Sequence, residues 1–187
     1  MATIMKVILL LVNPVIFTCL SSTSSAKGIA LWNDPDCYIS KKISNVSPQQ
    51  LVEEFLKEDS EGLLINSSKI EKFALCPGFQ GGPDAYEVVK RYSIKKEKIE
   101  KDKAEFLVTF DTLGTVSSGG SSGELNTFLK NIEQKNVLLK LIKTPYGWRI
   151  NFESTHTPRL TTSSARKYLP HRAWLPGKQR LFEETIK

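Results

Sequence analysis

The sequence predicts an α+β protein: a curved antiparallel sheet packed on one face by two N-terminal helices and followed by a basic C-terminal extension. Three observations predict this class. They are a capped amphipathic helix near residue 47, a short helical pattern near residue 68, and alternating apolar strands from residue 86 onward. The chain has 187 residues, of which 40% are hydrophobic and 25% charged. Such a composition fits one globular domain with appendages and excludes wholly disordered and multispan membrane proteins.

Residues 47–57 have the clearest helical pattern of the chain. Ser47 and Gln50 have the spacing of a capping box, and Pro48 suits the first position of a helix. Four apolar residues at helical spacing predict a stripe that packs on the body: Leu51, Val52, Phe55 and Leu56. A second, short helix is predicted over residues 68–75, before a Cys-Pro-Gly sequence that ends it.

After the helices the apolar periodicity changes to that of strands. Strands are predicted over residues 86–94, 104–110, 137–143 and 148–152. The charged run 95–103 is interpreted as a hairpin connection, and residues 128–132 fit either a strand or a short helix. Alternation in the first strand places on one side Tyr86, Val88, Lys90, Tyr92 and Ile94, and on the other Val89 and Arg91.

The first 26 residues have the pattern of a cleaved secretory signal. Lys6 precedes an apolar core over residues 7–20, and Ser24-Ser25-Ala26 supplies the small residues before a cleavage site. The core is shorter than the roughly 20 residues that a membrane-spanning helix needs. We therefore expect a secreted or periplasmic protein. An uncleaved membrane anchor and a lipoprotein lipidated at Cys19 are the alternatives.

Signal removal leaves two cysteines, Cys37 and Cys76. In an oxidising compartment they can form one disulfide, which would stabilise the fold by roughly 3–4 kcal/mol in the chain-entropy model. Two separate buried thiols are the alternative. Neither the cysteines nor His156 and His171 have the spacing of metal ligands, so no metal and no cofactor are predicted.

The net charge lies in the last part of the chain. Residues 27–156, the predicted single domain, contain 18 basic and 18 acidic residues, whereas the tail 157–187 carries a net charge of +5. Six tail residues mix positive charge with aromatic rings and are candidate contacts for an acidic protein surface or an anionic membrane surface: Arg166, Lys167, Tyr168, Arg172, Trp174 and Arg180. Nucleic acid is not an expected partner outside the cytoplasm. In the alternative, which we favour, the tail is a strap that packs Leu169, Trp174 and Leu175 on the body and leaves its charges in water.

The helix sequence SPQQLVEEFLKE and the final strand PYGWRINF resemble the nuclear-transport-factor-like (cystatin-like) cone fold over residues 47–152. The resemblance implies a conical sheet whose open end holds a small molecule or contacts a protein. Enzymes of this type use Asp/His pairs inside the cone. Here His156 and His171 both follow the last predicted strand, which argues against that chemistry.

The sequence therefore predicts an exported, non-catalytic binding or interaction protein. Its ligand would be a small apolar molecule in a pocket of strand aromatics, namely Tyr86, Tyr92, Phe106, Phe110 and Trp148. One alternative is a hydrolase or isomerase, which needs an inward carboxylate. Glu105 and Asp111 are the only acidic candidates on the strand that contains Phe106, and both are predicted on the opposite face from Phe106. The other alternative is a structural envelope-associated domain without an apolar pocket.

Overall fold

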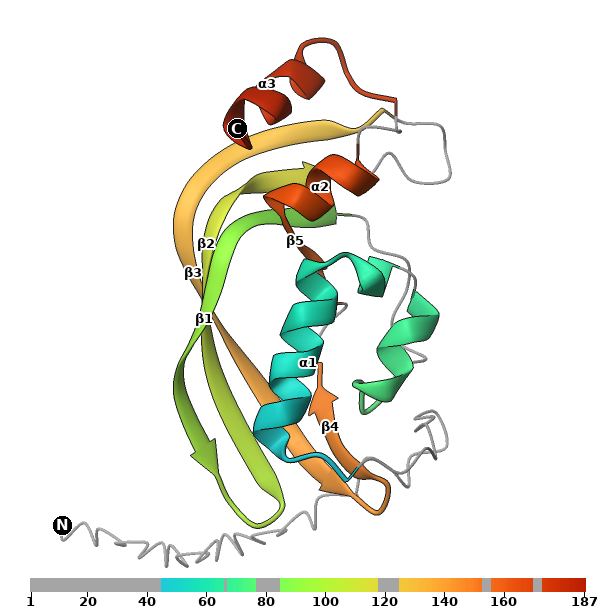
Figure 1. Ribbon diagram of the computed structural model, residues 1–187, viewed down its shortest axis with the longest axis vertical. Helices are drawn as coiled ribbons and strands as arrows, with labels where there is room; N and C mark the ends of the chain where they lie inside the picture. The colour runs from blue at the N-terminus through green and yellow to red at the C-terminus, as the bar shows by residue number, and fades with distance from the viewer. Residues whose placement is uncertain (1–44, 66, 77–84, 118–124, 153–155, 170–172) are drawn as a thin grey trace, which may run out of the picture.

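The computed structural model describes residues 45–65, 67–76, 85–117, 125–152, 156–169 and 173–187. Its strands are β1 (Ala85–Ile99), β2 (Lys103–Ser117), β3 (Thr127–Thr144), β4 (Gly147–Asn151) and β5 (Arg159–Thr161). They form one sheet in the order β4-β3-β2-β1-β5, which curls into a half-barrel (Figure 1). β5 is parallel to β1, and the other neighbouring strands are antiparallel. The predicted α+β class and curved sheet are confirmed.

Helix α1 (Pro48–Ser60) lies inside the curve of the sheet (Figure 1). Its predicted capping box is present, because the Gln50 backbone N–H donates to Ser47 Oγ and the Ser47 N–H donates to Gln50 Oε1. The predicted apolar stripe is buried: Leu51, Val52, Phe55 and Leu56. The helix continues three residues beyond the predicted end at Lys57, and this last turn brings Asp59 onto the buried side.

The second predicted helix is not an α-helix. Two 3₁₀ segments, η2 (Leu63–Ile65) and η3 (Ser67–Lys72), follow α1, and the chain then runs beside β4. The Leu75 N–H donates to the Ile150 carbonyl at 2.8 Å, and the Ile150 N–H donates to the Phe73 carbonyl at 2.7 Å. The Phe73 and Ala74 N–H groups still donate to the Ile70 carbonyl, whereas the Leu75 N–H bonds to the distant strand, so the helical pattern does not continue to the predicted end at residue 75.

The strands are longer than the apolar pattern indicates. β1 and β2 extend through most of the charged run 95–103, so that only residues 100–102 connect them. β3 joins the segments 128–132 and 137–143 into one strand of 18 residues. The added residues are mostly exposed, so they carry no apolar alternation and are held by backbone pairing with their neighbours.

Register shifts bend the sheet and divide its core. β1 is irregular between Val88 and Arg91, and β2 between Thr112 and Gly114. Such bulges bend a strand and change which side chains face inward. Strict alternation is therefore wrong at this point, because Val88 and Val89 are both buried whereas Lys90 is exposed.

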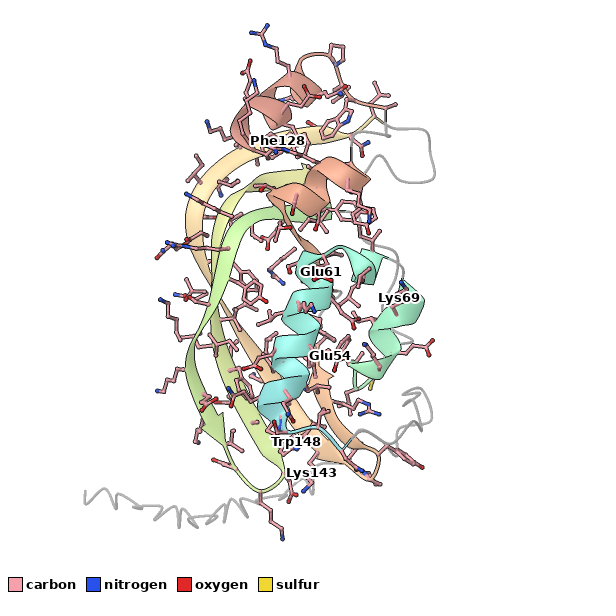
Figure 2. All side chains as sticks on the ribbon, in the orientation of Figure 1. Glu54, Glu61, Lys69, Phe128, Lys143 and Trp148 are labelled. Atoms are coloured by element: carbon pink, nitrogen blue, oxygen red, sulfur yellow. The ribbon has the colours of Figure 1, made fainter. Side chains whose placement is uncertain are left out.

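The two core clusters lie at opposite ends of the half-barrel. The first lies under α1 and comprises Leu51, Val52, Phe55, Leu56, Leu64, Phe73, Val89, Ala104, Phe106, Val108, Phe110, Leu139, Leu141, Trp148 and Ile150. The second comprises Tyr86, Val88, Val116, Phe128, Leu160, Ala165, Leu169, Phe182 and Ile186. Figure 2 shows Trp148 of the first cluster and Phe128 of the second far apart along the molecule.

The described part of the basic tail belongs to the fold and is not an extension from it. Residues 159–161 add strand β5, and helices α2 (Thr162–Tyr168) and α3 (Lys178–Thr185) follow. Leu160, Leu169 and Phe182 complete the second core cluster. The apolar residues of the tail thus decide its position, and most of its described charged side chains are exposed, with Arg159 as an exception. None of the described helices has both the length and the apolar character needed to cross a membrane.

Gly114 of β2 lies close to β3 beside the register shift, and its replacement tests this close approach. A Cβ atom there would lie 2.5 Å from the Leu129 carbonyl oxygen and 2.5 Å from the Phe128 ring. We expect Gly114→Ala to lower the free energy of unfolding by about 2 kcal/mol, the usual cost of overpacking, in urea titrations. Ser117→Ala, at an exposed position of the same strand, should change it by less than about 0.5 kcal/mol. Equal stabilities of the two variants would contradict the close approach.

Candidate functional site

A buried carboxylate stands on the apolar stripe of α1. Asp59 follows Phe55 by one helical turn and is only 1% exposed. Its Oδ1 lies 2.8 Å from Nε2 of His156, which is 9% exposed, and its Oδ2 accepts a hydrogen bond from the Arg159 backbone N–H at 3.2 Å. Asp59 therefore fastens residues 156–159, which lead into β5, to the end of α1.

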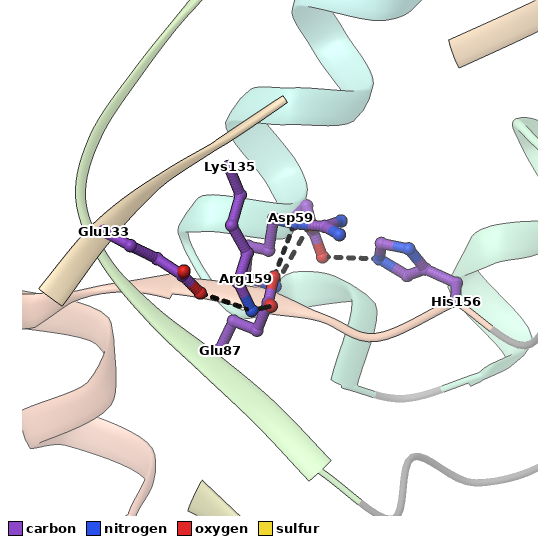
Figure 3. A network of polar contacts seen from close by, with 6 residues as sticks. All are labelled: Asp59, Glu87, Glu133, Lys135, His156 and Arg159. Carbon is purple, nitrogen blue, oxygen red and sulfur yellow. Dashed lines mark hydrogen bonds and ion pairs between the residues drawn. The ribbon is translucent and has the colours of Figure 1, made fainter. Parts of the chain in front are cut away.

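Glu87 of β1 holds two cations in the same network (Figure 3). Its Oε1 lies 2.7 Å from Lys135 Nζ, and its Oε2 lies 2.9 Å from Arg159 Nε. The hydrogen bond to Glu87 raises the pKa of Lys135. Glu133 lies beside Lys135 at 3.4 Å but is more exposed. The network thus joins β1, β3 and β5 to α1 across the interior of the half-barrel.

A cavity of about 220 Å³ adjoins this network where β4 ends beside β3. Its lining residues are Val137, Leu138, Leu139, Lys140, Ile150, Asn151, Phe152, His156, Thr157 and Arg159. The His156 ring packs between two aromatic rings, with centroid distances of 5.2 Å to Phe55 and 5.3 Å to Phe152. The cavity therefore has apolar walls and a polar region at His156 and Arg159.

The polar lining is basic or neutral. Lys140, His156 and Arg159 line the cavity, and none of its described lining residues is acidic. An apolar molecule with a hydrogen-bond acceptor or an anionic group matches such a lining. The Asp59–His156 pair has in addition the parts of an acid–base site, since a carboxylate fixes the orientation of an imidazole. Within the described ranges no three His, Cys, Asp or Glu side chains are grouped so that they could hold a metal ion.

The five aromatic residues predicted to line a pocket lie in the core. Phe106, Phe110 and Trp148 belong to the first core cluster, Tyr92 packs against it, and Tyr86 belongs to the second. None of the five is among the residues that line the cavity. Burial raises the pKa of Tyr92, with smaller contributions from Glu53 and Glu61. The structure thus gives these rings a packing role and brings other residues to the cavity.

Glu105 and Asp111, the carboxylates predicted on the opposite face from Phe106, do not line the cavity. Glu105 is exposed. Asp111 forms an ion pair with Arg91 and accepts a hydrogen bond from Gln134, and the Arg91 contact lowers the pKa of Asp111. These contacts join β1, β2 and β3 on the side of the sheet away from the core. The buried carboxylates of the network are instead Asp59 and Glu87.

The tail candidates are divided between the surface and the second core cluster. Arg166 is exposed but donates to the Ile186 carbonyl, Lys167 lies over the Tyr168 ring, and Arg180 forms an ion pair with Glu184. Trp174 stacks on Phe182 with centroids 5.1 Å apart. Arg172 lies outside the described residues. Leu169 is buried and Leu175 is exposed, so the strap interpretation holds for Leu169 and Trp174 but not for Leu175.

Sequence reasoning missed Asp59, Glu87, His156 and Arg159. His156 follows the last predicted strand in the sequence, but Asp59 binds it from α1, and β5 returns the chain to the sheet after it. Asp59 had a signal, since it continues the stripe of Phe55 and Leu56 at helical spacing. His171 lies outside the described residues.

The predicted disulfide between Cys37 and Cys76 remains a prediction, because Cys37 lies outside the described residues. Cys76 is partly buried and packs with Leu75, Ile142 and Tyr146 near the turn between β3 and β4. The predicted signal segment, residues 1–26, also lies outside the described residues.

We compared the chain with models of protein families, with curated proteins and with solved structures, and none of these comparisons gave a match.

Proposed function

We propose that this is an exported protein that binds a small, mostly apolar molecule in the cavity between β3, β4 and the segment that leads into β5. The observation that carries the proposal is the lining of the cavity. Val137, Leu139 and Phe152 supply apolar walls, and His156 and Arg159 supply hydrogen-bonding groups at fixed positions. An apolar pocket with a few convergent polar groups is the usual form of a small-molecule site.

Two features support a cone-like binding domain of the nuclear-transport-factor type. The sheet is curled, and its first helix lies inside the curve. The cavity opens at the end of short strand β4.

The signal pattern of residues 1–26 supports export. We favour binding over catalysis because the hydrogen bonds of the Asp59 carboxylate already give it a structural role: they hold residues 156–159 against α1.

A second candidate function is acid–base catalysis by the Asp59–His156 pair. It is favoured by one observation, namely that a buried imidazole held by a carboxylate lines the same cavity. The reaction class would be an isomerisation or hydrolysis of a small molecule. Chemical conversion of a bound molecule by the wild-type protein, with loss of conversion in a folded His156→Gln variant, would decide for this candidate.

Native mass spectrometry of the protein from its own host tests export and binding together. We expect a chain that lacks residues 1–26 and retains a small-molecule mass. Added indole, a neutral aromatic of cavity size, should shift the amide signals of residues 137–140 and 150–152 in nuclear magnetic resonance spectra, since apolar cavities of about 150 Å³ bind benzene. Val137→Phe should abolish these shifts by filling the cavity, and Ile132→Phe, at an exposed position of the same strand, should not. An intact chain, without retained mass and without a response to indole, would contradict the proposal.

A further inference from the structure

We infer that the ligand is a small carboxylate whose anionic group binds the guanidinium of Arg159. The inference rests on the proposed function and adds the chemical class of the ligand. Its first basis is the lining, in which the ionisable side chains Lys140, His156 and Arg159 are all basic. An anion entering such a cavity meets the Arg159 guanidinium and no described acidic lining residue.

The position of Arg159 is fixed from three sides. Its Nε lies against Glu87 (Figure 3). Its backbone N–H donates to Asp59, and its guanidinium carbon lies 4.7 Å from the centre of the Phe110 ring. The side chain is 14% exposed and belongs to a residue that lines the cavity. A guanidinium held in this way loses little conformational entropy when it binds an anion.

The terminal nitrogens of Arg159 are available for a ligand. Its Nε faces Glu87, and in the described part of the chain its two terminal nitrogens have no hydrogen-bond partner. A guanidinium has five N–H donors in a plane, and two of them can bind both oxygens of a carboxylate. Arg159 can therefore bind Glu87 and a ligand carboxylate with different edges of one group.

Glu87 does not depend on Arg159 alone. Lys135 lies 2.7 Å from its other oxygen, so Glu87 keeps one paired cation while Arg159 shares its charge with a ligand. Asp59 is occupied by His156 and by the Arg159 backbone N–H. The buried network thus retains its own pairings when a carboxylate binds, which lowers the cost of burying another charge.

Benzoate and benzamide test this inference, because the two molecules have the same shape and differ in charge. We expect wild-type protein to bind benzoate about ten-fold more tightly than benzamide, as one charge-assisted bidentate contact provides. In Arg159→Gln the preference should disappear while benzamide affinity stays within about two-fold. Lys140→Gln removes a positive charge from the same lining and should keep most of the preference.

The double variant Glu87→Gln with Arg159→Gln keeps the buried charges balanced and replaces the single variant if that one does not fold. A preference that survives in folded Arg159→Gln or in the double variant would overturn the role of Arg159. Equal affinities of wild-type protein for benzoate and benzamide would overturn the carboxylate inference and leave the proposed function standing. If neither compound nor indole binds, the proposed function itself fails.

Discussion

Replacing Asp59 with alanine is expected to lower the free energy of unfolding by about 3 kcal/mol, the range for removing one partner of a buried hydrogen-bonded charge. The variant leaves the buried His156 ring and the Arg159 backbone N–H without their acceptor. It also releases residues 156–159 from α1, so the cavity should lose its polar lining. Urea unfolding followed by circular dichroism measures the stability, and the indole titration measures the cavity.

Two further variants separate the carboxylate from the helix that carries it. Asp59→Asn keeps the shape of the side chain but replaces one carboxylate oxygen with an amide nitrogen, and it should lose about half as much stability as Asp59→Ala, since one neutral acceptor remains. Glu53→Ala changes an exposed carboxylate of the same helix and should cost less than about 0.5 kcal/mol. If Asp59→Ala is as stable as Glu53→Ala, Asp59 does not fasten the two segments.

Helix α1 could be predicted because all of its signals are local. The capping box joins Ser47 and Gln50, which are three residues apart, and the buried stripe repeats within the helix itself. The segment after it could not be predicted, because Phe73 and Leu75 bond to Ile150 of β4. A hydrogen-bond partner so distant in the chain cannot be recognised from the local sequence pattern.

The candidate site was hidden for the same reason. Glu87 alternates with Tyr86 and Val88 and should point outward in a regular strand, but β5 lies beside it and brings Arg159. β5 itself has three residues, too few for a periodic pattern. The cavity lies where β4 ends beside the middle of β3 and meets the segment that leads into β5, a meeting that depends on topology and not on composition.

The position of residues 157–187 depends on a similar point. The excess of positive charge distinguishes the composition of the tail from that of residues 27–156, but charged side chains mostly lie in water and do not fix the position of a segment in the fold. Position in the fold follows instead from the few apolar residues between those charges, such as Leu160, Leu169 and Phe182. A net charge of +5 in residues 157–187 therefore says little about whether they pack.

Replacing Phe182 with alanine tests most directly whether the tail is part of the domain. Phe182 is 1% exposed, meets the Phe128 ring edge-on at 5.5 Å and stacks on Trp174. We expect Phe182→Ala to cost about 3–4 kcal/mol of unfolding free energy, as truncation of a buried aromatic ring does. The loss should appear in the unfolding of the whole protein, because the ring packs on β3 and not only on its own helix.

Leu175→Ala is the matched control, since Leu175 is an apolar tail residue that is 41% exposed. It should cost less than about 1 kcal/mol, because most of its apolar surface is in water already. In a tail that merely extends from a finished domain, both substitutions would leave the main urea transition unchanged. A large loss for Phe182→Ala beside a small one for Leu175→Ala requires α3 to close the second core cluster, and residues 157–187 then cannot be removed without opening the half-barrel at that end.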